Sequence, residues 1–545
     1  MRRVNPSAGV YTLENDMSVR ASAASTSIVA VVGEAGRGPV GVPTDIFDDT
    51  DLLAKFGHSD ARLYGFGLYS AQRALSGTSN LKYVRVVSED ALTAGAYLTV
   101  DDITEPYPHL ALTVFDDGSN NALGMQDPMA NHAFQMDDPA TENTMAFFCA
   151  NSPGSWSKEL TIKIVPSAPA GISLDDERHY NPFHFAVEVY VNYLNANSRP
   201  VERFVVSRNY EVNGDGDQMF IEDVINTYSA YIQVRNNPHC PPVKIKKEAM
   251  EFLDGGADGT RPHEGLIRKG WDLFEDAEVI DVNLLCNAGY TTSSVQRHML
   301  ALAEKRGDCI AILDLPRASH ETARAVHYVM NDLNYSSSYG GMYAPYLVIR
   351  DTNSAKEIAI PPSGDVCAAM AYTDQVAAVW FAAAGLRRGK LKVLSIVEKY
   401  KKGARNSLDR AKVNVIRNLP GRGFVIMGQD TLQRHDSALS NINVRRMTNM
   451  IKKTLANAAT ISNFDPQDDI TRTTLRTICN DFLRPIKAGR GLHEFETVCD
   501  TRNNPPDVVA NGDLVLDVYA DPTIPSKRIH LNAHLMPTGT YFNEE

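Results

Sequence analysis

The chain has 545 residues, 43% of them hydrophobic and 22% charged, which is the composition of a globular protein with several domains. No apolar run reaches the roughly 18 residues that a transmembrane helix needs, and the N-terminus lacks the apolar segment of a signal peptide. We therefore expect a protein that is made and kept in a cytosol. The seven cysteines form no C-x-x-C motif, so we expect buried free thiols rather than disulfides or metal ligands.

The net charge of −12 is distributed unevenly. The segment 387–453 contains 17 Lys and Arg residues against 4 acidic ones, a net charge of +13, which leaves −25 for the rest of the chain. A basic segment in an otherwise acidic chain indicates a specific acidic partner. Nucleic acid and an acidic protein surface are both candidates.

Residues 1–24 predict an extended arm with little core of its own. Only Val10, Tyr11 and Leu13 lie in a strand-like pattern. Such a segment either adds a strand to the edge of another sheet or frays as a terminus, and the local residues favour neither outcome.

The next stretch, residues 25–89, predicts an α/β unit. Its elements are a strand, two helices and a second strand, at 27–33, 48–56, 62–75 and 81–87. The glycine-rich segment 34–39 after the first strand is not expected to bind phosphate. No Lys-Ser/Thr pair follows it, and Pro39 stands where a helix N-terminus would offer N–H groups.

Residues 90–148 are rich in Asp, Asn, Met and Pro and predict an inserted, surface-exposed domain of strands and loops. Asp137, Asp138 and Glu142 lack EF-hand spacing and indicate a solvated surface rather than a calcium site. After this insertion, alternating stretches predict an antiparallel meander. They cover residues 159–165, 185–193 and 201–206.

A mostly parallel sheet is predicted in the middle of the chain, because apolar strands alternate there with helices. The strands are at 279–286, 308–315 and 344–350, and the helices at 293–306 and 320–333. Asp314 ends the second of these strands, where an α/β enzyme would place a catalytic acid. Since no glycine-rich loop or second titratable group accompanies it, we favour a structural role and keep an enzyme as an alternative.

The last part of the chain predicts an α+β domain. Two strands joined at 419–423 are followed by a helix from Asn443 to Ala459 with one apolar face and one basic face. A second helix is expected to begin with Asp465 as its cap and to stop at Pro485. Three strands at 494–500, 513–520 and 527–535 close the domain, and a polar tail covers 537–545.

The histidines form no recognisable site. His530 and His534 lie on a predicted strand, where four residues span about 13 Å, so they are too far apart to share an ion. His320 and His327 share a helical face without a third ligand. The sequence therefore predicts no catalytic residue, no cofactor and no metal.

Short motifs are spread along nearly the whole chain. They are Gly9-Val10-Tyr11, residues 25–44, Phe56-Gly57 with the YVRVV strand, Pro153-Gly154-Ser155-Trp156, Gly255–Gly259, Ile312–Pro316, Pro361–Asp374 with Val379-Trp380, Val413–Leu432, Asn443–Arg446 and Asn503–Pro506. In these motifs and in their order, the chain resembles a known family, the sheath proteins of contractile bacteriophage tails. Residues 90–148 match nothing general in the family, which fits an insertion that varies between sheaths.

The resemblance implies a multidomain α/β and α+β protein: a mostly parallel α/β core, an inserted β-rich outer domain, an α+β C-terminal domain and extended arms at both ends. The boundaries expected on this basis are an arm at 1–24, a middle region at 25–89 and 149–390, the insertion at 90–148, an inner, tube-facing domain at 391–536 and a tail at 537–545.

It also implies a structural protein rather than an enzyme. Hexameric rings would stack into a helical tube around a tail tube, and the tube would shorten to drive the tail tube through the host envelope. The implied partners are other copies of the chain, the tail tube protein, and baseplate and tail terminator proteins, with no membrane and no direct nucleic acid. Such a protein is assembled in the host bacterial cytoplasm and belongs to the virion.

Two sets of site residues follow from the resemblance. The basic helical face is the candidate tube contact, with Arg445, Arg446, Lys452 and Lys453. The arms are the candidate links between subunits, with Val10, Tyr11, Leu13, Leu516, Val518, Ile529 and Leu531. Two alternatives remain open, namely the sheath of a phage-derived bacterial injection device and a nucleic-acid-binding protein that uses the 387–453 segment.

Overall fold

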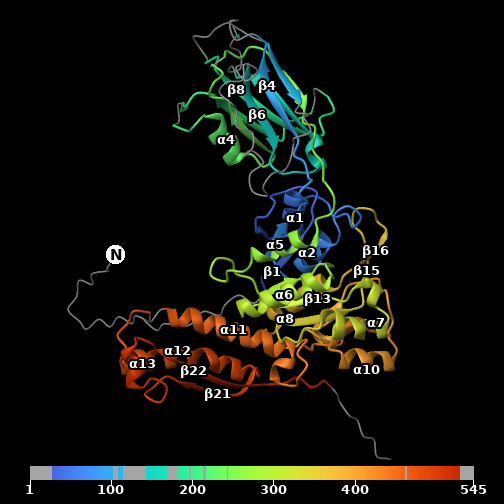
Figure 1. Ribbon diagram of the computed structural model, residues 1–545, viewed down its shortest axis with the longest axis vertical. Coiled ribbons are helices and arrows are strands. Elements are labelled where there is room, and N and C mark those ends of the chain that lie inside the picture. Colours follow the sequence, from blue (N-terminus) through green and yellow to red (C-terminus); the bar gives the residue numbers. More distant parts are fainter. Residues whose placement is uncertain are drawn as a thin grey trace, which may run out of the picture. The chain divides into compact units, whose positions relative to one another are not determined.

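The computed structural model describes residues 27–101, 109–114, 143–167, 173, 181–195, 198–212, 216–241, 243–460 and 463–527. They form two compact units (Figure 1). One comprises Thr26–Ala378 and Ala382–Ile442, and the other contains Val379–Phe381 and the chain from Asn443 onward. The predicted arm at 1–24, the tail at 537–545 and all but the first residue of the predicted strand at 527–535 lie outside the described residues.

A nine-stranded sheet forms the centre of the larger unit. Its strand order is β17-β20-β19-β14-β13-β12-β1-β3-β2. The six strands from β19 to β3 run parallel, and β2, β17 and β20 pair antiparallel at the two ends. The strands are β1 (Val29–Gly33), β2 (Thr44–Ile46), β3 (Leu81–Arg85), β12 (Leu284–Cys286), β13 (Ile310–Asp314), β14 (Gly340–Ala344), β17 (Lys390–Leu391), β19 (Val413–Leu419) and β20 (Gly423–Ile426).

Helices cover both faces of this sheet, as the continuous apolar strands predict. Along β1, Val29 and Val31 pack in one apolar cluster and Ala30 and Val32 in another, because successive side chains point to opposite faces. The first cluster includes α1 (Asp49–Phe56), α2 (Gly67–Leu75) and α8 (Ser363–Val376). The second includes α5 (Glu264–Asp272), α6 (Ser293–Arg306), α7 (Thr322–His327) with the π-turn Tyr328–Leu333, and α10 (Lys402–Arg410).

The contact between α2 and α8 depends on small residues. A Cβ atom on Gly364 would lie 2.4 Å from the carbonyl oxygen of Ser70, and one on Gly77 would lie 2.2 Å from that of Ala368. Glycine at these two positions lets the helix backbones approach closely.

The strand predicted at 344–350 is split in the structure. Strand β14 ends at Ala344, and Leu347–Arg350 forms β15 in a separate sheet with β16 (Glu357–Ile360) and β18 (Ser395–Ile396).

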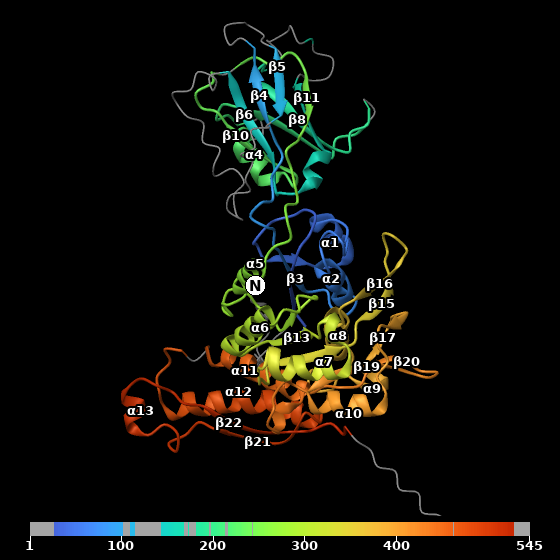
Figure 2. The same ribbon diagram turned by 45° about the vertical axis from the view of Figure 1, so that its right-hand side comes forward.

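The β-rich part of the larger unit contains two four-stranded antiparallel sheets, ordered β10-β6-β4-β5 and β11-β7-β8-β9. Both sheets contribute to one apolar cluster, together with helix α4 (Ile221–Tyr228). The strands are β4 (Gly95–Val100), β5 (Leu110–Val114), β6 (Thr144–Ala150), β7 (Leu160–Pro166), β8 (His184–Val191), β9 (Glu202–Ser207), β10 (Ile232–Asn236) and β11 (Ala249–Phe252). Figure 2 shows these strands gathered together.

The predicted end of the insertion at residue 148 is therefore wrong. Strand β6 crosses that position and pairs with β4 on one side and β10 on the other. The meander at 159–206 belongs to the same β-rich part, because β7 and β8 bury Ile162 and Val187 in the cluster that also holds Leu98 and Phe148. Sequence periodicity predicted the strands of the meander but not that they share one apolar core with the strands of the insertion.

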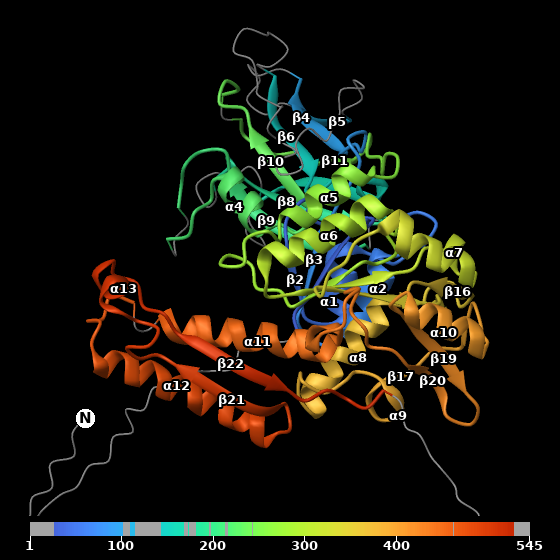
Figure 3. The same ribbon diagram turned by 60° about the horizontal axis from the view of Figure 1, so that its bottom comes forward.

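The smaller unit is an α+β layer. Helix α11 (Ile442–Ala459) and helix α12 (Asp469–Ala488) lie alongside the antiparallel ribbon of β21 (Leu492–Val498) and β22 (Asp517–Pro522), as Figure 3 shows, and the short helix α13 (Pro506–Ala510) connects the two strands. The unit has its own apolar core, built around Met447, Leu455, Leu483 and Ile486.

The expected boundary of this domain at 391 is also wrong. Strands β19 and β20 belong to the nine-stranded sheet, and the division falls after Ile442. In addition, the segment Val379–Phe381 joins the smaller unit from an earlier part of the chain. There the Trp380 indole donates to the carbonyl oxygen of Gly489 at 2.9 Å, and the Asn443 amide donates to the carbonyl oxygen of Trp380 at 2.8 Å.

Helix α12 begins and ends later than predicted. Asp468, not Asp465, is its cap and accepts a hydrogen bond from the Thr471 N–H at 2.8 Å. The helix also continues through Pro485. Although proline removes one backbone donor, the neighbouring Ile486 is buried in the core of the unit, and that packing holds the last turn in place.

All seven cysteines are buried and free, as predicted. Burial raises the pKa of the Cys479 thiol to about 11, and it raises the pKa of the thiols of Cys240 and Cys499 as well. Within the described ranges, no helix combines the length and the apolar character needed to cross a bilayer.

Candidate functional site

Three of the sequence motifs that are far apart in the chain meet at one buried side chain, Arg85 at the end of β3. Its guanidinium donates to four carbonyl oxygens. They belong to Ala35 at 2.8 Å, Gly36 at 3.3 Å and Gly38 at 2.8 Å, in the loop after β1, and to Pro153 at 2.8 Å, just after β6. Arg85 is only 1% exposed, and burial lowers its pKa to about 10, so it stays charged at neutral pH.

This arrangement explains the glycine-rich loop 34–39 better than ligand binding does. A phosphate-binding loop turns N–H groups toward its anion. Here the carbonyl oxygens of Ala35, Gly36 and Gly38 face a cation that the chain itself supplies. The loop has the opposite polarity to a phosphate site, in agreement with the sequence prediction.

Asp258 belongs to the motif at 255–259 and joins it to the motif at 153–156. Its carboxylate accepts hydrogen bonds from the Ser155 N–H at 2.9 Å and the Ser155 hydroxyl at 2.7 Å, and a long one from the Tyr64 hydroxyl at 3.4 Å. Gly154 has φ = +136°, and a Cβ atom there would lie 2.7 Å from the carbonyl oxygen of Gly36. Only glycine fits this position. The residues therefore fasten the segment that leaves the β-rich part to the turn between β6 and β7, and that turn lies against the loop after β1.

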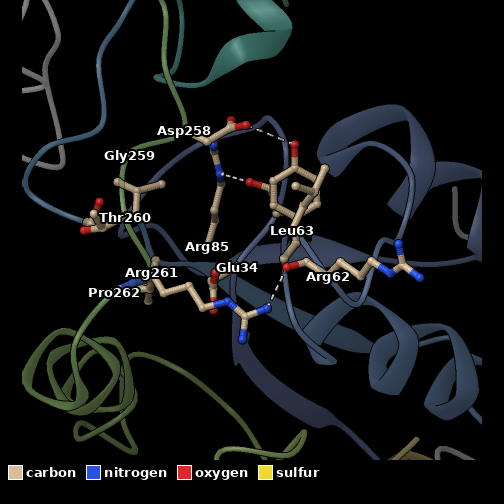
Figure 4. Close-up of a pocket in the computed structure, with 14 residues that line it drawn as sticks. Glu34, Arg62, Leu63, Arg85, Asp258, Gly259, Thr260, Arg261 and Pro262 are labelled. Atoms are coloured by element: carbon tan, nitrogen blue, oxygen red, sulfur yellow. Dashed lines mark hydrogen bonds between the residues drawn. The ribbon is translucent and has the colours of Figure 1, made fainter. Parts of the chain in front are cut away.

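A pocket of about 280 Å³ lies beside this network (Figure 4), and Glu34, Arg62, Arg85, Asp258 and Arg261 are among its lining residues. Arg261 reaches across to the carbonyl oxygen of Arg62 at 2.8 Å. Glu34 is nearly buried, and desolvation raises the pKa of its carboxyl group. Because Arg85 and Asp258 bond to other groups of the chain, the pocket borders a structural junction.

Asp314, the enzyme candidate of the sequence, is fully buried at the carboxyl end of β13. One carboxylate oxygen accepts from the Ser363 N–H at 2.8 Å, and the other accepts from the Ser363 hydroxyl at 2.7 Å and the Gly289 N–H at 3.0 Å. Burial raises the pKa of Asp314 to about 7, although these hydrogen bonds oppose the shift. Asp314 thus ties the first residue of α8 to the sheet, which is the structural role that we favoured.

The structure describes no group of three or more His, Cys, Asp or Glu side chains, within the residues it covers, that could hold a metal ion. Of the predicted pairs, His320 is buried and His327 is exposed, so they do not share one environment. His530 and His534 lie outside the described residues.

The predicted basic face of α11 is only partly exposed. Arg445 and Arg446 are 4% and 5% exposed, and the Arg445 guanidinium donates to the Asn449 side chain at 3.0 Å. Lys452 is exposed and Lys453 is half-buried. The expectation that the two arginines lie on an open surface is wrong, because the N-terminal half of α11 is buried around its whole circumference.

Two of the predicted arm residues lie in the described part of the chain. Leu516 and Val518 are partly buried against the core of the smaller unit. They therefore contact the core of their own unit, and their role as links between subunits stays a prediction. Val10, Tyr11, Leu13, Ile529 and Leu531 lie outside the described residues.

Comparison with known proteins identifies the two units. Residues 269–432 match the phage tail sheath protein central domain, and residues 434–535 match the phage tail sheath C-terminal domain. The chain belongs to the tail sheath family. The step from one match to the next, at 432 to 434, lies close to the division that the structure places after Ile442.

Two curated relatives agree with this assignment. The tail sheath protein of Enterobacteria phage T4 is 29% identical over 314 residues, covering 54% of this sheath chain and 48% of the relative. That of Vibrio phage KVP40 is 28% identical over 371 residues, covering 63% and 54%. The sheath chain thus spans about half the length of these curated relatives.

Two structures resemble the fold over almost the whole sheath chain. The sheath tail protein of Listeria innocua superposes with a TM-score of 0.55 and 11% identity, covering 92% of this chain and 96% of that one. The contracted helical sheath of the anti-feeding prophage superposes with a TM-score of 0.52 and 13% identity, covering 97% and 99%. Both likenesses concern the fold.

Replacing Arg85 with methionine tests the junction. Arg85→Met keeps the length of the side chain but leaves buried carbonyl oxygens without a donor, so we expect the free energy of unfolding to fall by about 3–5 kcal/mol. Urea denaturation measures this change. Arg62→Met is the matched control, because Arg62 is an exposed residue of the same pocket, and it should change stability by no more than about 0.5 kcal/mol. Equal effects of the two substitutions would contradict the role of Arg85.

Replacing Asp314 with asparagine tests its buried carboxyl group. Its pKa is about 7 in the folded chain, above the usual 3.8, so the folded state binds a proton that the unfolded state has lost, and stability falls as pH rises from about 4 to 7. This contribution has a slope of up to about 1.4 kcal/mol per pH unit. The difference between wild type and Asp314→Asn isolates it from His320, whose lowered pKa of about 4 gives the opposite slope. The stability of wild type minus that of Asp314→Asn should show this slope across the range, the exposed control Glu278→Gln minus Asp314→Asn should show it as well, and wild type minus the control should show none.

Proposed function

We propose that this chain is the subunit of a contractile tail sheath, which forms stacked hexameric rings around a tail tube and shortens to drive that tube through the host envelope. The observation that carries the proposal is the succession of two sheath-domain matches, over residues 269–432 and 434–535. The protein would be assembled in the cytoplasm of the host bacterium and become part of the virion.

The arms would link neighbouring subunits. The smaller unit contains a ribbon of only two strands, β21 and β22, among the residues that the structure describes. Each strand of such a ribbon has one edge whose backbone groups pair with no described strand, and an extended segment of another subunit can add to it. Residues 1–24 and the chain after Lys527 are the segments proposed for this exchange. Backbone pairing would keep the subunits joined while their domains move.

The tube contact is proposed for the C-terminal half of α11. Lys452 is exposed and Lys453 is half-buried, whereas Arg445 and Arg446 are too deeply buried to form the main contact with another protein. Exposed ion pairs contribute about 0–1 kcal/mol each. A contact of that strength holds when repeated along a tube and still releases when the sheath shortens. Baseplate and tail terminator proteins would bind the ends of the sheath.

Shortening would be mechanical. The extended polymer would be a metastable state, and the contracted polymer would gain contacts between subunits, so that their difference in free energy does the work. The polarity of the loop 34–39 agrees with a mechanism that needs no nucleotide there. An alternative is the sheath of a bacterial injection device, since the contracted sheath of the anti-feeding prophage shares the fold over 97% of this chain. Gene neighbourhood distinguishes the two.

Deleting the N-terminal arm tests self-assembly. The purified full chain should form long hollow tubes in negative-stain electron microscopy. A variant lacking residues 1–20 should keep the circular dichroism spectrum and melting temperature of the full chain but form no tubes, because the linking strand is gone. Normal tubes from the truncated chain would refute the arm proposal. Absence of tubes from the full chain, alone and on added tail tubes, would refute the proposed function.

Charge reversal on α11 tests the tube contact. The double variant Lys452→Glu with Lys453→Glu should sediment with purified tail tubes about tenfold less than wild type at low salt, because it replaces attraction by repulsion, while self-assembly is retained. The matched control reverses Arg268 and Lys269, two exposed basic residues on α5. Equal binding of both variants to the tube would place the contact elsewhere.

A further inference from the structure

The two ends of the nine-stranded sheet carry opposite charge. Strand β17 is the last strand at one end, and β2 is the last at the other. Figure 2 shows β17, β19 and β20 next to one another, with α9 (Gly385–Arg388) beside them, and Figure 3 labels β2 close to β3 and α1. The basic end lies within the basic segment 387–453, and the tube contact proposed on α11 uses neither end.

The first end is basic. Four exposed side chains on α9, on and after β17, and at the β19–β20 turn form what we name the basic edge: Arg387, Lys390, Lys392 and Arg422. None of the four is in an ion pair with another residue of the described chain. Burial lowers the pKa of the neighbouring Arg388, and the charge of Arg387 adds to this shift.

The second end is acidic. Strand β2 and the first turn of α1 carry four carboxylates that we name the acidic edge: Asp45, Asp48, Asp49 and Asp51. Lys82 and Lys55 pair with Asp45 and Asp51, so the edge keeps a net negative charge. The Asp45 side chain is still 59% exposed beside Lys82, and Asp49 is exposed.

Both edges also expose apolar side chains. Val42 and Phe47 flank β2, with Phe47 60% exposed, and Leu394 and Val397 follow β17, with Leu394 54% exposed. Single exposed apolar residues are ordinary on a protein surface. Here they lie among charges of one sign at each edge, which is the composition of a polar protein interface with an apolar centre. The edge strands have only three and two residues, so a contact would be made by side chains more than by backbone pairing.

We propose that the basic edge of one subunit docks on the acidic edge of the next. The inference rests on the proposed function, because it assigns a surface to the contact between copies of this chain. Two different surfaces at opposite ends of one sheet make a head-to-tail contact, which closes into a ring or continues as a helix. A second copy is the occupant because each copy carries both complementary charges. The contact adds to the linking arms and, being ionic, weakens as salt screens it.

Exchange of charge between the edges tests the proposal with full-length chains. One variant reverses the basic edge, Lys390→Glu with Lys392→Glu. The other reverses the acidic edge, Asp45→Lys with Asp49→Lys. Each alone should form tubes about tenfold more slowly than wild type at low salt, as followed by light scattering and negative-stain microscopy. The matched control, reversal of Arg268 and Lys269, should assemble at the wild-type rate. Circular dichroism and melting temperature establish that each variant is folded.

Mixing the two edge variants gives the decisive result. The reversed basic edge is now complementary to the reversed acidic edge of the other variant, and the two unchanged edges also remain complementary, so an equal mixture should recover the wild-type rate. If the wild type assembles but each edge variant assembles as fast as the control, or if the mixture fails to recover, the proposal is overturned and the proposed sheath function stands. If the wild type forms no polymer, the proposed function itself fails.

Discussion

A single buried guanidinium determines how the larger unit is put together. Arg85 ends a strand of the central sheet, and its four carbonyl partners lie in the loop after β1 and in the segment that follows β6. A buried cation is costly unless its donors are satisfied, so these loops must hold their carbonyl oxygens at the observed places. The glycines around Arg85 follow from this constraint, since Gly154 leaves no room for a side chain.

Buried polar groups also bond to other parts of the chain at the carboxyl edge of the sheet. In many α/β proteins that edge binds a ligand. Here Asp314 binds the backbone and the hydroxyl of Ser363, and Tyr290 donates to Glu34, so the polar groups of the edge are used to join strands, loops and helices to one another. The carboxyl edge of this sheet thus holds the elements of the fold together.

Sequence patterns predicted the elements of the sheet well and the boundaries of the domains poorly. The strand and helix at 308–315 and 293–306 agree with β13 and α6, because an apolar strand buried on both faces and an amphipathic helix leave clear periods. The end of the insertion and the division after Ile442 depend on which faces pack together, and that information is not local. Periodicity also assigned Arg445 to an open face, since it cannot register packing on more than one side of a helix.

Local sequence patterns also failed to predict the network around Arg85. Arg85 sits within the strand LKYVRVV, where a charged residue would normally point to solvent, and no local pattern shows that the loop after β1 and the segment after β6 cover it. The signal that was present is the recurrence of glycine in three motifs, residues 34–38, 153–156 and 255–259, each of which approaches another segment closely. Convergence of such motifs on one side chain requires the fold. Asp314 was easier to interpret, because its missing chemical partners already favoured a structural role.

The burial of the thiols has a consequence for the life of the assembled particle. A virion leaves the reducing cytosol and waits in air-saturated surroundings, with no chaperone or reductase to repair it. Every cysteine of this chain is shielded from solvent, and the raised pKa of Cys479 keeps that sulfur in its unreactive protonated form. In the sheath that we propose, oxidative damage would therefore begin at side chains other than the cysteines.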